Sequence, residues 1–335
     1  MNIYYNKAKS KTHGRPYIKF LKVILQKLIQ LITVLLFVSL ITFVLTDLAP
    51  GDPSTAMYEA AGIIPTEEML EATRSQLGLD TPLLERYFSW IGGVVRGDMG
   101  ESFSQHEEVL TLILRNLKST ISLALSVLGV TLLVSLPLGI ISAIKKNKFI
   151  DYIIRFTSFI SIASPNYLVA LILTFVFCYK LEWIPVFNPY GDFNAMILPV
   201  LSLALGMIAD YIRQIRALFL EELSQGYVYG ARARGVSEIK ILFVHVMKNT
   251  MIPLITLISF SLGSLLGGVA IVEVIFSFPG LGNLMIYAVE SRDYPLIQGV
   301  VLWIAMCYTV INICTDLLYR VVDPRVRKRA QGVIE

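Results

Sequence analysis

One segment of the chain has a spacing that could bind a nucleotide. From Gly230 to Ser237 the sequence reads Gly-Ala-Arg-Ala-Arg-Gly-Val-Ser, with glycines and serine placed as in a loop whose backbone N–H groups cradle phosphates. Val236 stands where a lysine would reach the phosphates, and no apolar strand leads into the segment. The residues therefore do not predict a nucleotide site. A solvated basic loop and a docking surface for another protein remain as interpretations.

The docking interpretation has more support in the surrounding residues. Gly226 and Gly235 bracket the segment from Tyr227 to Arg234, and glycine can end a helix or let the backbone approach a partner closely. Small residues alternate with arginines inside it, at Ala231, Arg232, Ala233 and Arg234. This pattern predicts a short helix of low relief whose cations pair with acids on the rim of a partner.

A second helix is expected directly after this segment. Ser237 can cap its start, and Glu238 suits the positive end of its dipole. Apolar residues then fall at helical spacing, at Ile239, Leu242, Phe243 and Val246. The spacing predicts one apolar face on this helix.

Other groups that could do chemistry are sparse. His245, with only His13 and His106 elsewhere, is interpreted as a structural histidine. The three cysteines all lie in apolar stretches and are typical of buried small residues: Cys178, Cys307 and Cys314. No Ser-His-Asp or paired-carboxylate arrangement is visible. We therefore expect no enzyme activity, no metal site and no cofactor.

Composition indicates a membrane protein with many spans. Hydrophobic residues make up 55% of the 335 residues, charged residues 16%, and the mean hydropathy is +0.65. Through Thr46 the chain carries seven lysines and arginines and no acid, which places its N-terminus in the cytoplasm by the positive-inside rule. A nucleic-acid-binding tail is the alternative, but an apolar span follows at once, so no nucleic-acid partner is expected.

The apolar stretches predict six spans with every basic loop on one side of the membrane. They cover residues 28–46, 120–144, 156–179, 196–212, 253–275 and 295–318. The first is too long for the apolar region of a secretory signal and lacks a cleavage site. The chain then divides into a basic cytoplasmic segment (1–27), the first span (28–46), an extracytoplasmic subdomain (47–119), a five-helix core (120–320) containing a cytoplasmic loop (213–252), and a basic cytoplasmic tail (321–335).

The outer segment is predicted to be a small helical subdomain. Acids outnumber arginines there, which suits the outer face. Thr66 can cap one helix, Pro82 can open another that runs through Tyr87 and Trp90, and Gly97 to Gly100 breaks it. We expect the subdomain to pack on the outer membrane surface with its aromatic residues near the interface.

Ionisable residues inside the spans would indicate a pump or a proton-coupled carrier. Asp210, Glu273 and Asp316 each lie near the end of a span, where contact with water explains them. No inverted repeat is visible. A secondary carrier or channel is therefore the less favoured alternative.

Several segments together resemble the permease subunits of bacterial ABC importers, in the dipeptide, oligopeptide and nickel branch. The resemblance extends from about Lys22 to Arg329. It includes Gly51-Asp-Pro53, Leu77-Gly-Leu-Asp80 with Pro82, Gly97-Asp-Met-Gly100 with Ser102, Ala231-Arg-Ala-Arg-Gly235, Phe278-Pro-Gly-Leu-Gly282, Arg292-Asp-Tyr-Pro295 and Asp323-Pro-Arg325. In the wider family an Ile-x-Leu-Pro follows the loop glycine, whereas here that place reads His245-Val-Met-Lys248 and the proline comes at Pro253.

The resemblance implies an all-α, six-span permease of the type I importer fold, with a helical extracytoplasmic insertion after the first span. Such a subunit sits in the bacterial cell membrane with both termini in the cytoplasm. It forms half of a pathway for peptides or a metal chelate such as nickel. Its implied partners are a second, different permease, two cytoplasmic ATP-binding subunits and an extracytoplasmic solute-binding protein.

The resemblance also assigns one site, and the residues themselves predict a second. The ATPase-coupling residues would be Gly226, Tyr227, Ala231, Arg232, Ala233, Arg234 and Gly235. A rigid turn with flexible glycines beyond the fifth span, at Pro279, Gly280 and Gly282, is predicted as an outer gate, with a plain connecting turn as the alternative. A sensor subunit that binds ATPases without transporting stays open from sequence.

Overall fold

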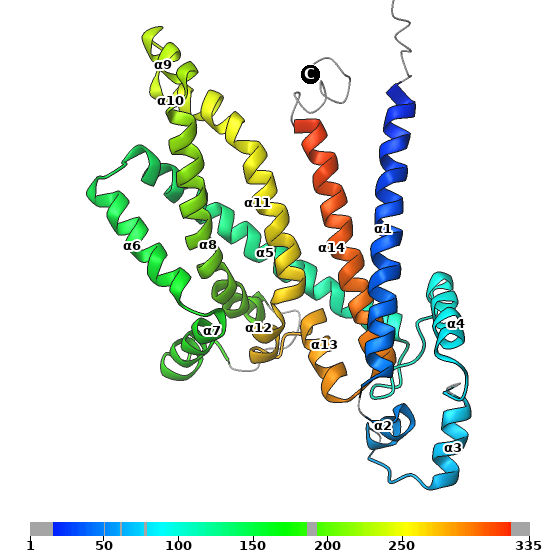
Figure 1. Cartoon of the computed structure of the whole chain (residues 1–335). Helices are drawn as coiled ribbons and strands as arrows, with labels where there is room; N and C mark the ends of the chain where they lie inside the picture. Colours follow the sequence, from blue (N-terminus) through cyan, green and yellow to red (C-terminus); the bar gives the residue numbers. More distant parts are fainter. Residues whose placement is uncertain (1–15, 50, 61, 77–78, 186–192, 323–335) are drawn as a thin grey trace, which may run out of the picture.

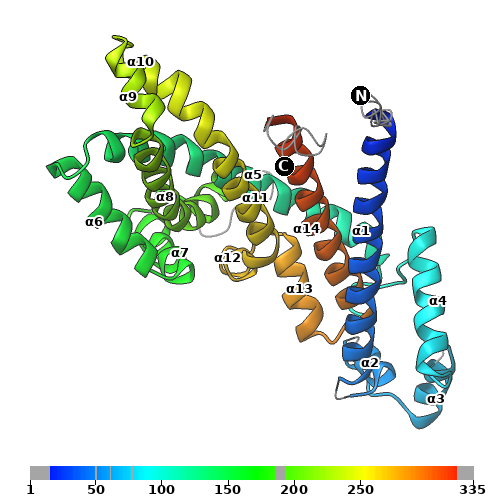
Figure 2. The same ribbon diagram turned by 45° about the horizontal axis from the view of Figure 1, so that its top comes forward.

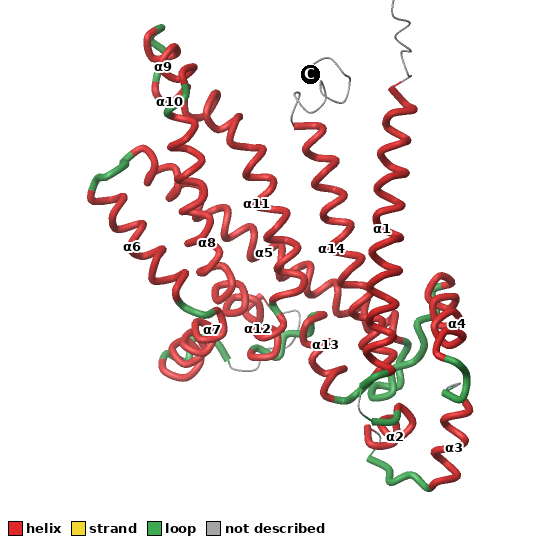
Figure 3. Tube along the Cα trace, in the orientation of Figure 1, coloured by secondary structure: helices red, strands yellow, loops and turns green. Residues whose placement is uncertain are grey.

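The computed structural model describes residues 16–49, 51–60, 62–76, 79–185 and 193–322 of the chain. In this part every regular element is helical, and Figure 3 shows helices joined by short loops. The N-terminal residues 1–15, the end of the tail with Asp323-Pro-Arg325, part of Leu77–Asp80 and Pro189 lie outside the described residues. Predictions that fall on them are not tested by the structure.

Five helical segments are long and apolar enough to cross a membrane, among the described residues. They are α1 (Pro16–Asp47), α5 (Val109–Ile144), α8 (Phe193–Leu223), α14 (Tyr294–Val322), and the run made of α10 (Glu238–Lys240), η2 (Ile241–Val246) and α11 (Met247–Gly268). Four of them (α1, α5, α8 and the run ending in α11) begin or end more than ten residues outside the predicted spans. At about 1.5 Å per residue, a helix as long as α5 exceeds the roughly 30 Å hydrocarbon core, so its ends project or it tilts.

The third predicted span is not a single kinked helix. Residues 156–179 are divided between α6 (Phe149–Ala163) and the run of α7 (Asn166–Thr174) and η1 (Phe175–Lys180), and the two parts meet at 96°. The break lies at Ser164, which is extended at φ −92° and ψ 121°. The following Pro165 disfavours the helical conformation at Ser164 and has no N–H to continue the helix, so the bend is sharp.

The outer subdomain has the helices that the sequence predicts. The two predicted helices are α3 (Glu67–Gln76) and α4 (Leu83–Arg96), and the structure adds α2 (Pro53–Ala60); α2 and α3 lie below α1 in Figure 1, and α4 lies beside its lower end. The Thr66 hydroxyl accepts a long hydrogen bond from the Met69 N–H, and Gly97 closes α4 at φ +90°. On α4, Tyr87 packs edge-on against Phe43 of α1 and shares a 2.9 Å hydrogen bond with Ser39. The aromatic residues therefore lie against the outer half of α1.

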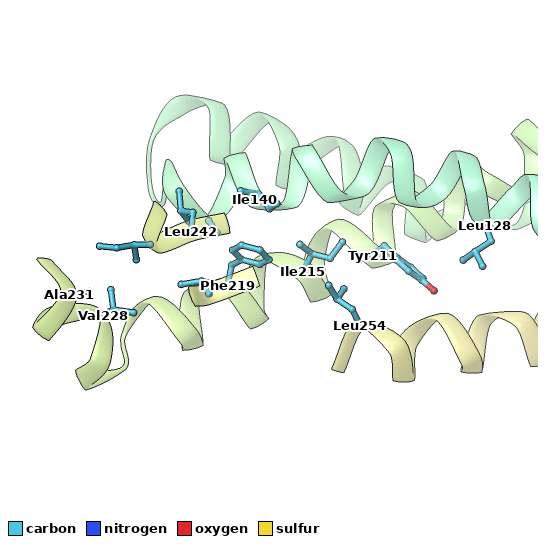
Figure 4. Packing of buried hydrophobic residues seen from close by; sticks show 12 residues of the cluster. Leu128, Ile140, Tyr211, Ile215, Phe219, Val228, Ala231, Leu242 and Leu254 are labelled. Atoms are coloured by element: carbon cyan, nitrogen blue, oxygen red, sulfur yellow. The ribbon is translucent and has the colours of Figure 1, made fainter. Parts of the chain in front are cut away.

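The core of the molecule is the long contact between α5 and α8. Both run from the predicted outer side toward the predicted cytoplasmic side, and they approach closely at Gly139, where a Cβ would meet the Ile215 side chain at 2.7 Å. Figure 4 shows the buried residues of this contact continuing into the short helices at its end. The two short helices α12 (Ala270–Ile275) and α13 (Leu281–Glu290) complete the outer side of the core.

At the other side of the molecule α1 packs against α14, which also packs against α11. Both views show α1 and α14 side by side (Figures 1 and 2). Near their predicted cytoplasmic ends, Lys27 forms an ion pair with Asp316. Asp316 therefore has a cationic partner, while Asp210 binds its own helix neighbours and stays partly exposed.

Candidate functional site

The predicted coupling helix is present as α9 (Gly226–Ala233), at the far end of α8. Gln225 takes the extended N-cap conformation, so Gly226 begins the helix rather than ending one. Gly235 closes the segment at φ +77°, a conformation that favours glycine. The Val236 N–H then bonds the Ala231 carbonyl at 3.2 Å. Gly226 and Gly235 thus bracket the helix as the sequence predicts.

One face of α9 is anchored in the protein core. Val228 and Ala231 are buried, in the same cluster as Phe219 of α8 and Leu242 of η2 (Figure 4). The prediction that Ala231 contributes to an exposed, low-relief surface is therefore wrong. Ala231 is needed inside, because α9 packs on α8 and η2 and a small residue lets them approach. Ala233 remains exposed.

The outward face of α9 carries Tyr229, which is 60% exposed, and two arginines. The sequence pattern predicts that Arg232 pairs with an acid on a partner, but the structure pairs it within this chain. Its Nε and Nη2 donate to Glu238 at 2.7 and 3.1 Å. Glu238 therefore serves this pair as well as the start of α10. Ser237 stands at the N-cap position of α10, but its side chain makes no cap bond. The Arg234 side chain is exposed, and its guanidinium forms no ion pair or hydrogen bond with any described residue.

A polar contact ties α9 to the two long helices beside it. The Tyr227 hydroxyl donates to Glu222 of α8 at 2.5 Å, and Asn249 of α11 donates to the same carboxylate at 3.2 Å. Burial, together with the bond to Glu222, raises the pKa of Tyr227 to about 12. Tyr227 is thus a neutral donor at any physiological pH. This contact and the buried face therefore link α9 to both α8 and α11.

The apolar face predicted on the following helix is only half correct. Leu242 and Val246 are buried, as is Ile241, but Ile239 is 72% and Phe243 is 58% exposed. The reason is that residues 241–246 form a π-helix, whose turn is wider than the 3.6-residue turn behind the prediction. The exposed pair adds apolar surface close to the exposed face of α9.

The segment predicted as an outer gate is built around a buried carboxylate. Glu273 of α12 has no exposed surface, so the expectation that it reaches water is wrong. Its Oε2 accepts the Asn283 N–H at 2.9 Å, and its Oε1 accepts the Thr120 hydroxyl of α5 at 3.1 Å. Thr120 in turn accepts the Leu281 N–H at 2.8 Å. Glu273 thus acts as a distant cap for α13, where an anion is favoured by the unpaired N–H groups and the dipole.

The glycines of this segment are close-packed rather than flexible. A Cβ on Gly280 would lie 1.9 Å from Glu273 Oε1, and one on Gly282 would lie 2.6 Å from Ala270 Cα. Both glycines are buried, while Pro279 is half-buried beside a cavity of about 270 Å³. Any movement of this segment must therefore be a movement of α12 and α13 together.

Two other buried carboxylates were missed from sequence. Asp293, before α14, accepts the hydroxyls of Ser102 and Ser104 at 2.6 and 2.8 Å, which joins the outer subdomain to the core. Asp151 of α6 accepts a bidentate pair from Arg216 of α8, both bonds at 2.8 Å. The signal for Asp293 was the resemblance itself, since Gly97–Ser102 and Arg292–Pro295 are both among its segments. The sequence alone gave no reason to pair Asp151 with Arg216.

Comparison with known proteins agrees with this architecture. A model of the family described as binding-protein-dependent transport system inner membrane component matches residues 135–328, and a model of its N-terminal part matches residues 20–124. A protein of Brucella suis biovar 1, provisionally named a peptide permease, is 38% identical over 317 residues, covering 92% of this chain and 99% of its own. The nickel import system permease protein NikB of Staphylococcus aureus is 36% identical over 307 residues, covering 92% of each chain.

A solved structure shares the fold. An inward-facing conformation of the MetNI methionine ABC transporter matches 64% of this chain and 97% of its own, with a TM-score of 0.53 and 15% identity. At that identity the likeness concerns the fold alone, which is the all-α type I importer permease fold that the resemblance implied. The chain therefore belongs to the family of binding-protein-dependent transport system inner membrane components, the membrane permease subunits of ABC importers.

Proposed function

We propose that this chain forms half of the translocation pathway of a peptide importer. We also propose that movement of two ATP-binding subunits is transmitted to it through α9. The observation that carries the proposal is the construction of α9. Val228 and Ala231 fix it to the core, while Tyr229, Arg234 and the nearby Ile239 and Phe243 are left exposed. A rigid helix of this kind can seat in a groove of a soluble subunit and pass its movement to α8 and α11.

The remaining partners follow from the same assembly. A second, different permease would complete the pathway, and a solute-binding protein would deliver the solute at the outer side, where α2 to α4 and the α12–α13 segment lie. The Pro279, Gly280 and Gly282 turn would form the outer gate, moving as a unit with Glu273. Both termini would lie in the cytoplasm of a bacterial cell.

Peptide is the favoured solute because the relative at 38% identity carries a peptide permease name over nearly its whole length. Nickel chelate is the second candidate, favoured by the relative at 36% identity with a nickel import name. The two relatives are almost equally similar to this chain, so a transport measurement has to distinguish peptide from nickel chelate. The test is uptake into proteoliposomes that contain both permeases and the ATPases, with the binding protein and ATP supplied. We expect a labelled tripeptide to accumulate; accumulation of nickel–histidine without tripeptide would replace peptide by chelate as the solute.

A further inference from the structure

The outer half of α5 carries a line of polar side chains on its exposed face. Thr111, Arg115, Lys118 and Ser122 are all exposed, and they follow one another at spacings of four, three and four residues. Residues at these spacings share one side of a helix. We call these four residues the polar stripe. Its neighbours on the same exposed face are apolar, among them Leu114, Ile121 and Leu125.

The polar stripe lies at membrane depth. The outer ends of α1 and α14 are level, because Gln298 donates to Thr46 at 2.7 Å. One turn into the α14 span, Gly299 packs so closely on α5 that a Cβ there would lie 2.5 Å from Val109 and 3.1 Å from Ile113. Lys118 comes more than a turn later along α5, which runs on obliquely behind α14 and α11 in both views (Figures 1 and 2).

Charged side chains at this depth need water or a partner of opposite charge. An ammonium group facing lipid is strongly unfavourable, and intramembrane charges usually face a polar interior or a water-filled cavity. Arg115 is held by Glu107 at 3.2 Å, and Thr111 bonds Glu108. The Lys118 ammonium forms no ion pair or hydrogen bond with any described residue. The stripe therefore carries one uncompensated positive charge.

We infer that the polar stripe lines the outer half of the translocation pathway, and that Lys118 receives the carboxylate of the passing solute. The apolar residues beside the stripe then seal against the second permease or lipid. A carboxylate fits because it is the anionic group shared by a peptide C-terminus and by amino-acid metal chelates, and an ammonium binds it as a mobile point charge. Arg115, neutralised by Glu107, keeps the stripe from holding the solute too tightly. The inference about the solute group rests on the proposed function; the placement of the stripe does not.

The placement is tested by thiol accessibility in the assembled complex, with the three native cysteines replaced. Ser122→Cys should react rapidly with membrane-impermeant thiosulfonates applied outside. The matched control is Ile121→Cys, one residue away and exposed but off the stripe, which should react much more slowly. Equal rates at the two positions would overturn the placement.

The charge of Lys118 is tested by the same cysteine. An anionic thiosulfonate should react faster at Ser122→Cys than a cationic one of similar size, relative to their rates with a free thiol. Removing the charge with Lys118→Ala should lower that normalised ratio by about tenfold. The reason is that a unit positive charge at roughly 6 Å in water attracts the anionic reagent and repels the cationic one. Lys118→Arg should keep it. No change with Lys118→Ala would mean that the ammonium is covered or paired, and would overturn its role.

The solute group is tested by uptake of labelled trialanine and of nickel–histidine. Lys118→Ala should lower uptake of the transported probe by at least about fivefold, the loss of one charge-assisted contact, with recovery in Lys118→Arg. A loss for one probe only assigns the carboxylate to that solute, and a loss for neither overturns the contact. If the unmodified complex takes up neither probe, the proposed function fails, while the thiol measurements still decide where the stripe lies.

Discussion

Gly280→Ala should be one of the most damaging single-methyl changes in the outer half of the protein. The added Cβ would lie 1.9 Å from Glu273 Oε1, so the carboxylate has to move. Its movement would break the bonds to the Thr120 hydroxyl and the Asn283 N–H, leaving buried donors unpaired. Overpacking costs about 1–3 kcal/mol and an orphaned buried donor about 1–3 kcal/mol, so we expect a loss of roughly 3–5 kcal/mol in all.

The cause of that loss can be isolated by a double-mutant cycle. Glu273→Ala should itself be destabilising, but it removes the atoms that the new methyl group meets. Gly280→Ala should then cost little more in the Glu273→Ala background, so the coupling energy should be most of the single-change loss, roughly 3–4 kcal/mol. The measurement is the midpoint of thermal unfolding of the purified permease pair in detergent, at one heating rate because unfolding is expected to be irreversible. A drop on the order of 5–10 °C is expected for the single change.

A control comes from α4 of the same chain. Gly92 is helical and a Cβ there would meet nothing within 4 Å, so Gly92→Ala should leave the midpoint unchanged or slightly raised. The reasoning would be refuted if Gly280→Ala behaved like Gly92→Ala, or if the two penalties at Gly280 and Glu273 simply added.

Three further outcomes are expected. In a cysteine-free background, Ile64→Cys, at a side chain that is 94% exposed in the outer subdomain, should be labelled by an impermeant thiol reagent outside sealed cells, whereas Ser237→Cys should be labelled only after the membrane is opened; labelling of both from outside would contradict the topology. Arg232→Glu should lower uptake by placing like charges together, and the exchange Arg232→Glu with Glu238→Arg should recover most of it; no recovery would mean that the arginine serves a partner instead of its own chain. Arg216→Leu should cost about 3–5 kcal/mol of stability by leaving a buried carboxylate unpaired, and a variant that melts like the unmodified pair would show that this ion pair is dispensable.

The sequence was informative where local chemistry determines the structure. Gly235 and Gly97 lie at helix ends in left-handed conformations. The residue type alone is enough to predict such an end. The Thr66 and Pro82 signals located α3 and α4, and long apolar runs located most of the spans. In each case the determining residues are neighbours in the chain.

The sequence was misleading where partners are distant or the helix geometry departs from the α-helix. Glu273 looked like a residue at a span end, but its burial depends on Thr120, which is 153 residues away. The π-helical turn at 241–246 displaced the apolar face, and no pattern of residues in the sequence predicted a π-helix there. The sequence also did not show that α5 continues back to Val109, because hydropathy alone located the span at residues 120–144.

The claim that α9 transmits ATPase movement is tested most directly by combining uptake with subunit co-purification. Gly235→Trp places a bulky side chain at the exposed, left-handed end of α9, where no described residue of this chain lies within 4 Å of an added Cβ, so a large effect should come mainly from a partner. Beyond the cost of about 1 kcal/mol for a non-glycine residue at this φ, assembly of the two permeases should be spared. Gly235→Ala carries the same backbone strain without the bulk and is the matched control. The account predicts that Gly235→Trp lowers uptake by at least about tenfold, which is equivalent to about 1.4 kcal/mol of coupling free energy. The variant should also lose bound ATPase or solute-stimulated ATP hydrolysis. Uptake by Gly235→Ala should stay near normal. Unchanged uptake with the ATPases still bound to the Gly235→Trp complex would contradict it.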